Sequence, residues 1–281
     1  MYFDSHAHIA SSPKDYIKIE EVVSRIKKAG VSKVVDSAVD IQTSKDVLNL
    51  HLKYPDLIIP TLGLHPEIVI PGSDIYNKDL DIDEEFDRLK KLYFDSKKYF
   101  KAVGECGLDY YWLDKDKDIG LDKKKKVKHL QELLFKRQID FARKINLPLI
   151  IHTREVEKES FDLISSLVKN RVPVLFHSFT GDIKIAENIF RHGYYISFNG
   201  IITYPSGENI REIFKLGFSK YQNQILAETD SPYLTPQQRR GQVCEPSDVR
   251  YVVDKMAELS KFRVGYMADL TYANACKFYS L

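Results

Sequence analysis

Imidazole and carboxylate side chains follow five short apolar runs that are spread over the whole chain. The runs read YFDSHAH, FKAVGE, LPLIIH, VPVLFH and ILAETD, and the residues of metal-ligand type at their ends are His6 and His8, Glu105, His152, His177 and Asp230. We expect each run to be a strand and each of these residues to open the loop that follows it. Such groups gathered at one place suit one or two divalent cations. Chance does not explain six such residues at strand ends, because unpaired imidazoles and carboxylates are costly to bury.

The first run carries two of these histidines on either side of one residue. Side chains alternate along an extended segment, so His6 and His8 point to the same side and can bind one metal. A single His-x-His is weak evidence, since two histidines this close are often ordinary loop residues. The later runs strengthen it, because residues of the same type recur at their ends.

Regular alternation of strands and helices is needed to bring these residues together. We expect strands at residues 2–4, 33–36, 57–62, 100–104, 149–151, 174–176, 194–198 and 225–227. Helical spacing predicts helices at residues 19–29, 41–52, 83–93, 127–145, 156–168, 183–190, 209–216, 249–259 and 264–278. Short, nearly continuous apolar strands of this kind indicate a parallel sheet that is buried on both faces.

This alternation favours an α/β fold of the (β/α)₈ TIM-barrel type. In such a barrel, residues at the C-terminal ends of different strands converge on one site. An open, doubly wound sheet is the alternative, because strand order cannot be read from the sequence. The chain has no Gly-x-Gly-x-x-Gly after the first strand and no P-loop, so we expect no nucleotide cofactor.

The 281 residues fit one barrel domain over residues 1–281. We interpret two stretches, Pro71–Asp83 and Trp112–Lys126, as loop insertions. The second carries alternating charges at 114–118 and then the lysine run Lys123–Lys126. That run is usual for a solvated face, but it follows the fourth strand and could equally hold a DNA backbone near the site.

The bulk composition sets limits on partners and compartment. Lys plus Arg is 42 and Asp plus Glu is 40, so the net charge is only +2, and nucleic-acid binding must use a local patch. Three scattered cysteines indicate reduced thiols in the cytoplasm, or in the nucleus of a eukaryote. We expect no signal peptide, and since the sequence has no apolar run of about 18 residues, we also expect no membrane partner. We also expect a monomer.

Six stretches of the sequence resemble the TatD-type metal-dependent deoxyribonucleases, which are amidohydrolase-like TIM barrels. They are DSHAH at 4–8, GLHP at 63–66, GECGLDYY at 104–111, the segment 138–152, HSFTG at 177–181 and ETDSPYL at 228–234. The resemblance runs from residue 2 to about 260 and touches most expected strand ends. It implies a hydrolase that uses divalent metal to cleave DNA phosphodiester bonds, with exonuclease activity at 3′ ends in several members.

The resemblance also implies roles for individual residues. His6 and His8 match ligands of one metal, His152 and His177 match ligands of a second, and Glu105 matches the carboxylate that bridges them or binds the first. Asp230 matches the carboxylate that binds the first metal and takes the proton of the attacking water. His65 matches a histidine at the site edge that contacts phosphate.

The physical chemistry of phosphodiester hydrolysis agrees with these roles. A phosphodiester is anionic and repels a nucleophile, and two divalent ions would screen that charge and activate water. Mixed imidazole and carboxylate ligands tolerate Zn²⁺ or Mn²⁺, whereas a site for Mg²⁺ alone usually has fewer imidazoles. Asp4 and Asp109 are expected to orient the histidines.

Further residues are candidates for binding DNA. Arg154 could contact a phosphate or merely pair with Glu155. Tyr110, together with the adjacent Tyr111 and Trp112, could stack on bases or pack against the barrel rim.

Two other classes of function stay open. One is a different metal-dependent hydrolase on the same barrel, acting on an amide, an amine or an ester such as an aminoacyl-tRNA. Glu105 argues against the relatives that need a carbamylated lysine at the fourth strand. The other is a DNA-binding protein that has lost its activity. Fold alone does not separate these from a nuclease.

Overall fold

A computed structural model describes residues 1–11, 18–96, 98–115, 119–169 and 171–281 of the chain. Residues 116–118, which carry part of the alternating charges noted above, lie outside the described residues. Within them, eight strands form one sheet in the order β1-β2-β3-β4-β5-β6-β7-β8, and neighbouring strands in this order are parallel. The strands are β1 (Tyr2–Ala7), β2 (Val31–Asp36), β3 (Ile58–Leu62), β4 (Ala102–Asp109), β5 (Leu149–Arg154), β6 (Val174–Phe176), β7 (Tyr195–Phe198) and β8 (Ile225–Ala227).

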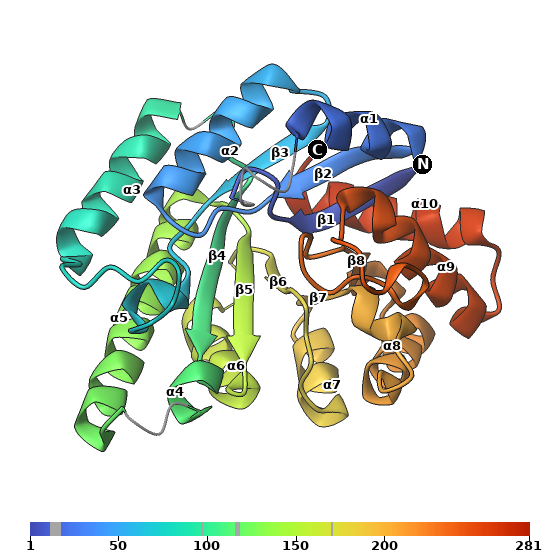
Figure 1. Ribbon diagram of the computed structural model, residues 1–281. Helices are drawn as coiled ribbons and strands as arrows, with labels where there is room; N and C mark the ends of the chain where they lie inside the picture. Colours follow the sequence, from blue (N-terminus) through green and yellow to red (C-terminus); the bar gives the residue numbers. More distant parts are fainter. Residues whose placement is uncertain (12–17, 97, 116–118, 170) are drawn as a thin grey trace.

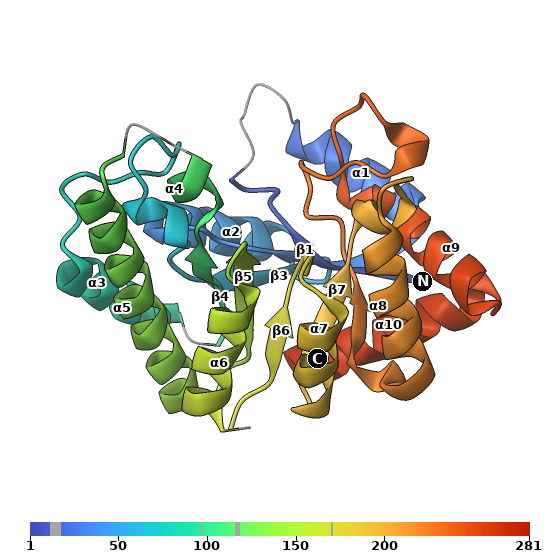
Figure 2. The same cartoon turned by 90° about the horizontal axis from the view of Figure 1, so that it is seen from below.

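Helices surround the strands, as the view in Figure 2 shows. They are α1 (Ile19–Lys28), α2 (Ile41–Lys53), α3 (Ile82–Ser96), α4 (Tyr111–Lys115), α5 (Leu121–Ile145), α6 (Glu157–Val168), α7 (Ile183–Arg191), α8 (Glu208–Lys220), α9 (Val249–Ser260) and α10 (Val264–Tyr279). Short 3₁₀ turns are η1 (Pro66–Val69), η2 (Gly200–Thr203), η3 (Gln222–Gln224), η4 (Gln237–Arg239) and η5 (Pro246–Asp248). Sequential strands with helices between them make a (β/α)₈ barrel, so the prediction of the fold class is confirmed and the doubly wound alternative is wrong.

The last strand meets the first through the residues that follow it. The backbone N–H of Asp230 donates to the carbonyl of His6 at 2.9 Å, and that of His8 donates to the carbonyl of Ser231 at 2.7 Å. The Asp4 carboxylate accepts from the backbone N–H of Thr229 at 2.8 Å and from its hydroxyl at 2.6 Å. Asp4 thus joins β1 to the β8 end. Its Oδ1 also accepts from the backbone N–H of His6 at 3.4 Å, whereas we expected Asp4 to orient a histidine ring.

The barrel interior is filled by one buried side chain from each strand. These side chains are Phe3, Val35, Ile59, Ala102, Ile150, Leu175, Tyr195 and Leu226. At the N-terminal end of the barrel, the C-terminal part of α10 closes it, because Tyr279 stacks on Phe3 with ring centres 6.1 Å apart. The Tyr279 hydroxyl donates to the carbonyl of Ser5 at 2.9 Å. Side chains therefore fill the N-terminal end of the barrel. The arrows of β4 and β5 in Figure 1 point toward the opposite end, which is the place for a site.

Several element boundaries differ from the predictions. β1, β4 and β5 continue past their apolar runs, so that His6, Glu105 and His152 lie inside strands and do not open loops. Polar residues remain part of β4 and β5 because the pairing of these two strands continues through them, from Cys106 opposite Ile151 to Asp109 opposite Arg154.

The interpretation of residues 112–126 as a loop insertion is wrong for the described part. Residues 111–115 form α4, and α5 begins at Leu121, so Lys123–Lys126 stand on its first turns. Lysine has a high helix propensity and these side chains are mostly exposed, which lets the helix extend beyond its apolar stripe. The stretch at 71–81 is largely turn, as expected, and α3 begins at Ile82.

Candidate metal centre

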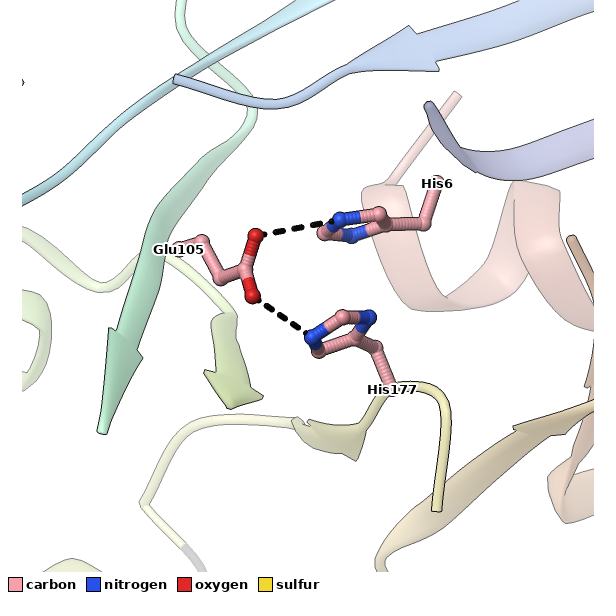
Figure 3. Close-up of side chains that lie close together, drawn as sticks. All are labelled: His6, Glu105 and His177. Carbon is pink, nitrogen blue, oxygen red and sulfur yellow. Dashed lines mark ion pairs between the residues drawn. The ribbon is translucent and has the colours of Figure 1, made fainter. Parts of the chain in front are cut away.

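The predicted ligand residues meet at the C-terminal end of the barrel. Glu105 from β4 lies between His6 from β1 and His177 from the end of β6 (Figure 3). One carboxylate oxygen of Glu105 is 3.2 Å from His6 Nε2, and the other is 2.7 Å from His177 Nε2. Glu105 and both histidines are almost fully buried. Residues 171 positions apart in the chain therefore share one buried polar site.

Glu105 is the centre of this site because further imidazoles face its carboxylate. Its Oε1 is 2.8 Å from His152 Nδ1 and 3.4 Å from His65 Nε2, and its Oε2 is 3.3 Å from His8 Nε2. Burial raises the pKa of Glu105, but the positive charges of His177, His65 and His6 outweigh it and hold the pKa well below its usual value. Glu105 is accordingly an anion at neutral pH.

Asp230 completes the group on the side of β1. Its Oδ1 is 3.4 Å from His8 Nε2 and 3.7 Å from His6 Nε2. Burial raises the pKa of Asp230, but the hydrogen bond to His8 and the nearby imidazoles outweigh it and lower the pKa. The backbone of Asp230 has φ 59°, a left-handed conformation that aspartate tolerates better than most residues. Its side chain is 14 % exposed, so water reaches it.

The close packing of β4 against β5 depends on glycine. Gly107 has φ 151°, and a Cβ there would lie 1.9 Å from the carbonyl oxygen of His152. A side chain at this position would push the two strands apart. Gly107 therefore allows Glu105 on β4 to reach His152 on β5.

Three of the ligand-type imidazoles are also held through their second ring nitrogen. His6 Nδ1 is 3.1 Å from the Ser37 hydroxyl, and His8 Nδ1 is 3.0 Å from the Ser37 carbonyl. His152 Nε2 is 3.2 Å from Asp109 Oδ2, a contact that suits the orienting role expected for Asp109. Contacts of this kind fix the ring orientation and the tautomer of a metal-binding histidine.

His177 has a similar neighbour in Glu228. The two residues are buried, and His177 Nδ1 is 3.6 Å from Glu228 Oε1, just beyond hydrogen-bond length. The same oxygen accepts from the backbone N–H of Ser178 at 2.7 Å, which fixes the carboxylate in place. Sequence reasoning missed Ser37 and Glu228 as supporting residues, although both lie directly after strands, as the ligands were expected to do.

The donor set fits divalent metal. His6 Nε2 and His8 Nε2 are only 3.2 Å apart, and His177 Nε2 is 3.5 Å from His152 Nδ1. Two facing imidazole nitrogens can share only one proton, whereas a cation between them would satisfy both. The groups whose ligand atoms lie within 4.8 Å of one another are His6, Glu105 and His177; His6, His8 and Asp230; and His65, Glu105 and His152.

The imidazoles hold protons strongly without a metal. Burial lowers the pKa of His152, but its hydrogen bonds to Asp109 and Glu105 outweigh burial and raise that pKa to about 9. For His8 and His177 the nearby carboxylates also outweigh burial, and the pKa of each is well above its usual value. His6 differs, because burial and the charge of His177 lower its pKa.

His65 faces the site with a defined tautomer. Its Nδ1 accepts from the backbone N–H of Glu67 at 3.2 Å, so in the neutral ring the proton is on Nε2. That nitrogen points at Glu105 and can donate a hydrogen bond. A ring nitrogen that carries a proton does not bind metal, so this geometry suits the expected contact with an anionic oxygen better than a place among the ligands.

The remaining candidates lie around the rim. Arg154 stacks on Tyr111, with the guanidinium carbon 3.7 Å from the ring centre. The ring of Tyr110 instead has the Lys128 ammonium 4.1 Å from its centre and packs partly against the core. Cys106 is buried with its thiol toward the carbonyl of Ile150, and burial raises its pKa, as for a small core residue. In the described part of the chain, no helix combines the length and the apolarity that crossing a bilayer requires.

Comparisons with known proteins agree on one family. A family model described as TatD related DNase matches residues 3–280. The chain is 31% identical to the "Uncharacterized metal-dependent hydrolase YabD" of Bacillus subtilis (strain 168), covering 100% of both chains.

Solved structures show the same barrel. The crystal structure of YJJV, a TatD homologue from Escherichia coli K12, has a TM-score of 0.82 and 25% identity, and covers 100% of this chain and 98% of that one. The lactonase Lmo2620 from Listeria monocytogenes has the fold in common, with a TM-score of 0.63 at 15% identity over 98% of this chain and 94% of that one.

Proposed function

The chain belongs to the family of TatD-related DNases, a family of metal-dependent hydrolases, and on that premise we propose that it is a deoxyribonuclease. It hydrolyses DNA phosphodiester bonds one nucleotide at a time from the 3′ end. The observation that carries the proposal is the buried Glu105 carboxylate, which faces imidazoles from β1, from β5 and from the end of β6. An anion surrounded by nitrogen ligands, at the open end of a barrel, is suited to hold cations against a phosphate.

The ligands divide into two groups that share Glu105. His6, His8 and Asp230 would hold one divalent ion, of which Zn²⁺, Mn²⁺ and Mg²⁺ are the candidates. His152 and His177 would hold a second, with Glu105 between the two. Divalent metal bound there supplies Lewis acidity, which lowers the pKa of water and offsets the charge of the phosphate.

Side chains of the protein supply the proton transfer, the contact with phosphate and the orientation of the ligands. Asp230 stays ionised because its pKa is lowered, and its partly exposed carboxylate takes the proton of the attacking water. His65 donates from Nε2 to a phosphate oxygen, since its Nδ1 is occupied by the Glu67 N–H. Asp109 and Glu228 keep His152 and His177 in orientation.

The lysines at the start of α5 offer a local basic patch for the DNA backbone. Lys123, Lys125 and Lys126 are exposed on its first turns. A low net charge makes such a patch the natural contact with a polyanion. Neutralising the run Lys123–Lys126 is expected to weaken DNA binding and to flatten its salt dependence. If the salt dependence of DNA binding does not change, these lysines only form a solvated face and do not contact DNA.

The test is the hydrolysis of end-labelled DNA by protein that has been stripped of metal with EDTA. We expect mononucleotides to leave the 3′ end only after Mg²⁺, Mn²⁺ or Zn²⁺ is added. If the protein binds metal but cleaves only an amide, an amine or a carboxylic ester, the substrate class is wrong. If it binds DNA and holds no metal, the protein is a binding module.

A further inference from the structure

A cavity of about 520 Å³ opens beside the ligand cluster, a volume that is typical of small-molecule sites. Its lining includes Tyr111, at the start of α4, and Arg154, at the end of β5. The side chains that matter here are those of Tyr111, Arg154, Glu155, Glu157, Asp182 and Asn209. Because Arg154 follows the candidate ligand His152 by two residues on β5, a molecule in the cavity would adjoin the metal centre.

Arg154 presents a flat cation to this cavity. Its guanidinium stacks on Tyr111 and lies 5.6 Å from the ring centre of Trp112. The Lys115 ammonium contacts the same tyrosine, through its hydroxyl and 3.8 Å from its ring centre. Among the described residues Arg154 forms no ion pair, although the carboxylates of Glu155, Glu157 and Asp182 line the same cavity. Its hydrogen-bond donors are therefore available.

The position of this stack is tied to the candidate metal ligands. Asp109 bonds His152 Nε2 through one carboxylate oxygen, and its other oxygen accepts from the backbone N–H of Tyr111 at 2.9 Å. The backbone N–H of Tyr110 donates to the carbonyl of Arg154 at 3.1 Å. One carboxylate thus orients both a ligand histidine and the ring on which Arg154 rests.

The charges of the cavity select against phosphate and for amino groups. Glu155, Glu157 and Asp182 repel an anion, so a phosphate is better placed at the metal centre. Asp182 Oδ1 accepts from the backbone N–H groups of Lys184 and Ile185, and one oxygen of Glu157 accepts from the N–H of Glu155. The other oxygens of these carboxylates are free, among the described residues, to accept from a ligand. A flat ring with an amino group satisfies both features of the cavity.

A nucleobase is such a ring. Unpaired bases stack on guanidinium planes and on aromatic rings, and adenine, cytosine and guanine carry amino groups that thymine lacks. We propose that this cavity holds the nucleobase of the terminal nucleotide during cleavage, and that it favours amino-bearing bases over thymine. The inference rests on the proposed nuclease function and adds to it a site that senses the base.

Binding can be measured apart from cleavage. Trp112 is the only tryptophan of the chain, is 46 % exposed and lies beside Arg154, so its fluorescence reports on the cavity. In metal-loaded protein, we expect deoxycytidine and deoxyadenosine to change the emission and thymidine to bind at least about threefold more weakly. Arg154→Gln weakens the binding about tenfold. Tyr266→Leu, at an exposed tyrosine of α10 that does not line the cavity, is the control and leaves binding unchanged.

Two results of the titration would overturn the proposal. Equal binding of thymidine and deoxycytidine would show that the carboxylates do not select the base. Binding of inorganic phosphate, but of no nucleoside, would make Arg154 a phosphate contact.

Cleavage provides the second test, with oligonucleotides that end in dC, dA, dT or an abasic residue. We expect kcat/KM to fall in that order, with dC and dA alike, and we expect Tyr111→Leu to compress the differences. Equal cleavage of all four ends contradicts the base site and leaves the nuclease function intact. Cleavage of none contradicts the nuclease function, and the nucleoside titration then decides whether the cavity binds bases.

Discussion

Metal binding at this site is expected to release protons, because His152 is protonated at neutral pH when no metal is bound. Burial lowers its pKa, but hydrogen bonds to Asp109 and Glu105 raise that pKa to about 9. A histidine that ligates a metal must be neutral. Since the raised pKa favours the protonated ring, the competing proton is present below about pH 9 and is lost as the pH rises through that value.

The size of the effect follows from the same pKa. At pH 7, about two units lower, roughly one molecule in a hundred has a neutral His152, which weakens the apparent affinity about 100-fold. Raising the pH from 6.5 to 8.5 is expected to tighten Mn²⁺ binding roughly 80-fold through His152 alone. His8 and His177 add to the effect if they too lose protons, since the pKa of each is raised.

Titration calorimetry of Mn²⁺ into metal-free protein measures both quantities. At pH 7 we expect the apparent enthalpy to differ between PIPES and Tris by an amount equivalent to at least one released proton. Asp109→Asn removes one of the two carboxylates that raise the pKa and reduces the pH dependence. His192→Asn, at an exposed histidine, is the control and behaves like the parent protein. Equal enthalpies in both buffers, with a dissociation constant that does not change from pH 6.5 to 8.5, would refute the reasoning.

Three further outcomes are expected. Asp230→Asn at saturating metal lowers turnover by about 10²-fold or more and leaves DNA affinity within about threefold, since the amide cannot take the proton; normal turnover would exclude that role. Glu228→Gln weakens Mn²⁺ binding about 10–100-fold by calorimetry, and an unchanged affinity would mean that Glu228 does not orient the neighbouring ligand. Gly107→Ala costs roughly 3 kcal/mol in urea unfolding, because its Cβ meets a carbonyl oxygen. Gly120→Ala, where the space is open, stays within about 0.5 kcal/mol, and equal midpoints for the two variants would contradict the crowding.

The sequence predicts the barrel because each strand is a short apolar run and each helix has its own apolar spacing. It also places the ligand types near strand ends, which in a parallel barrel is enough to bring them together. The exact ends of β1, β4 and β5 could not be predicted. His6, Glu105 and His152 are polar, and only the neighbouring strand and the facing imidazoles make them suitable for a strand interior.

The supporting residues were the hardest to predict. Glu228 and Ser37 act on imidazoles that come from other strands, so their roles depend on how the barrel closes and not on local spacing. The start of α5 was missed for another reason. Its first turns carry lysines and no apolar stripe, so the helical periodicity begins later than the helix does.

The most direct test is the location of bound metal. Crystals soaked in Mn²⁺ should show an anomalous scattering peak within coordination distance of His6, His8 and Asp230, and a second peak, if two ions bind, near His152 and His177 beside Glu105. Manganese bound only elsewhere on the molecule, with no peak at Glu105, would contradict the assignment of this cluster as the metal centre.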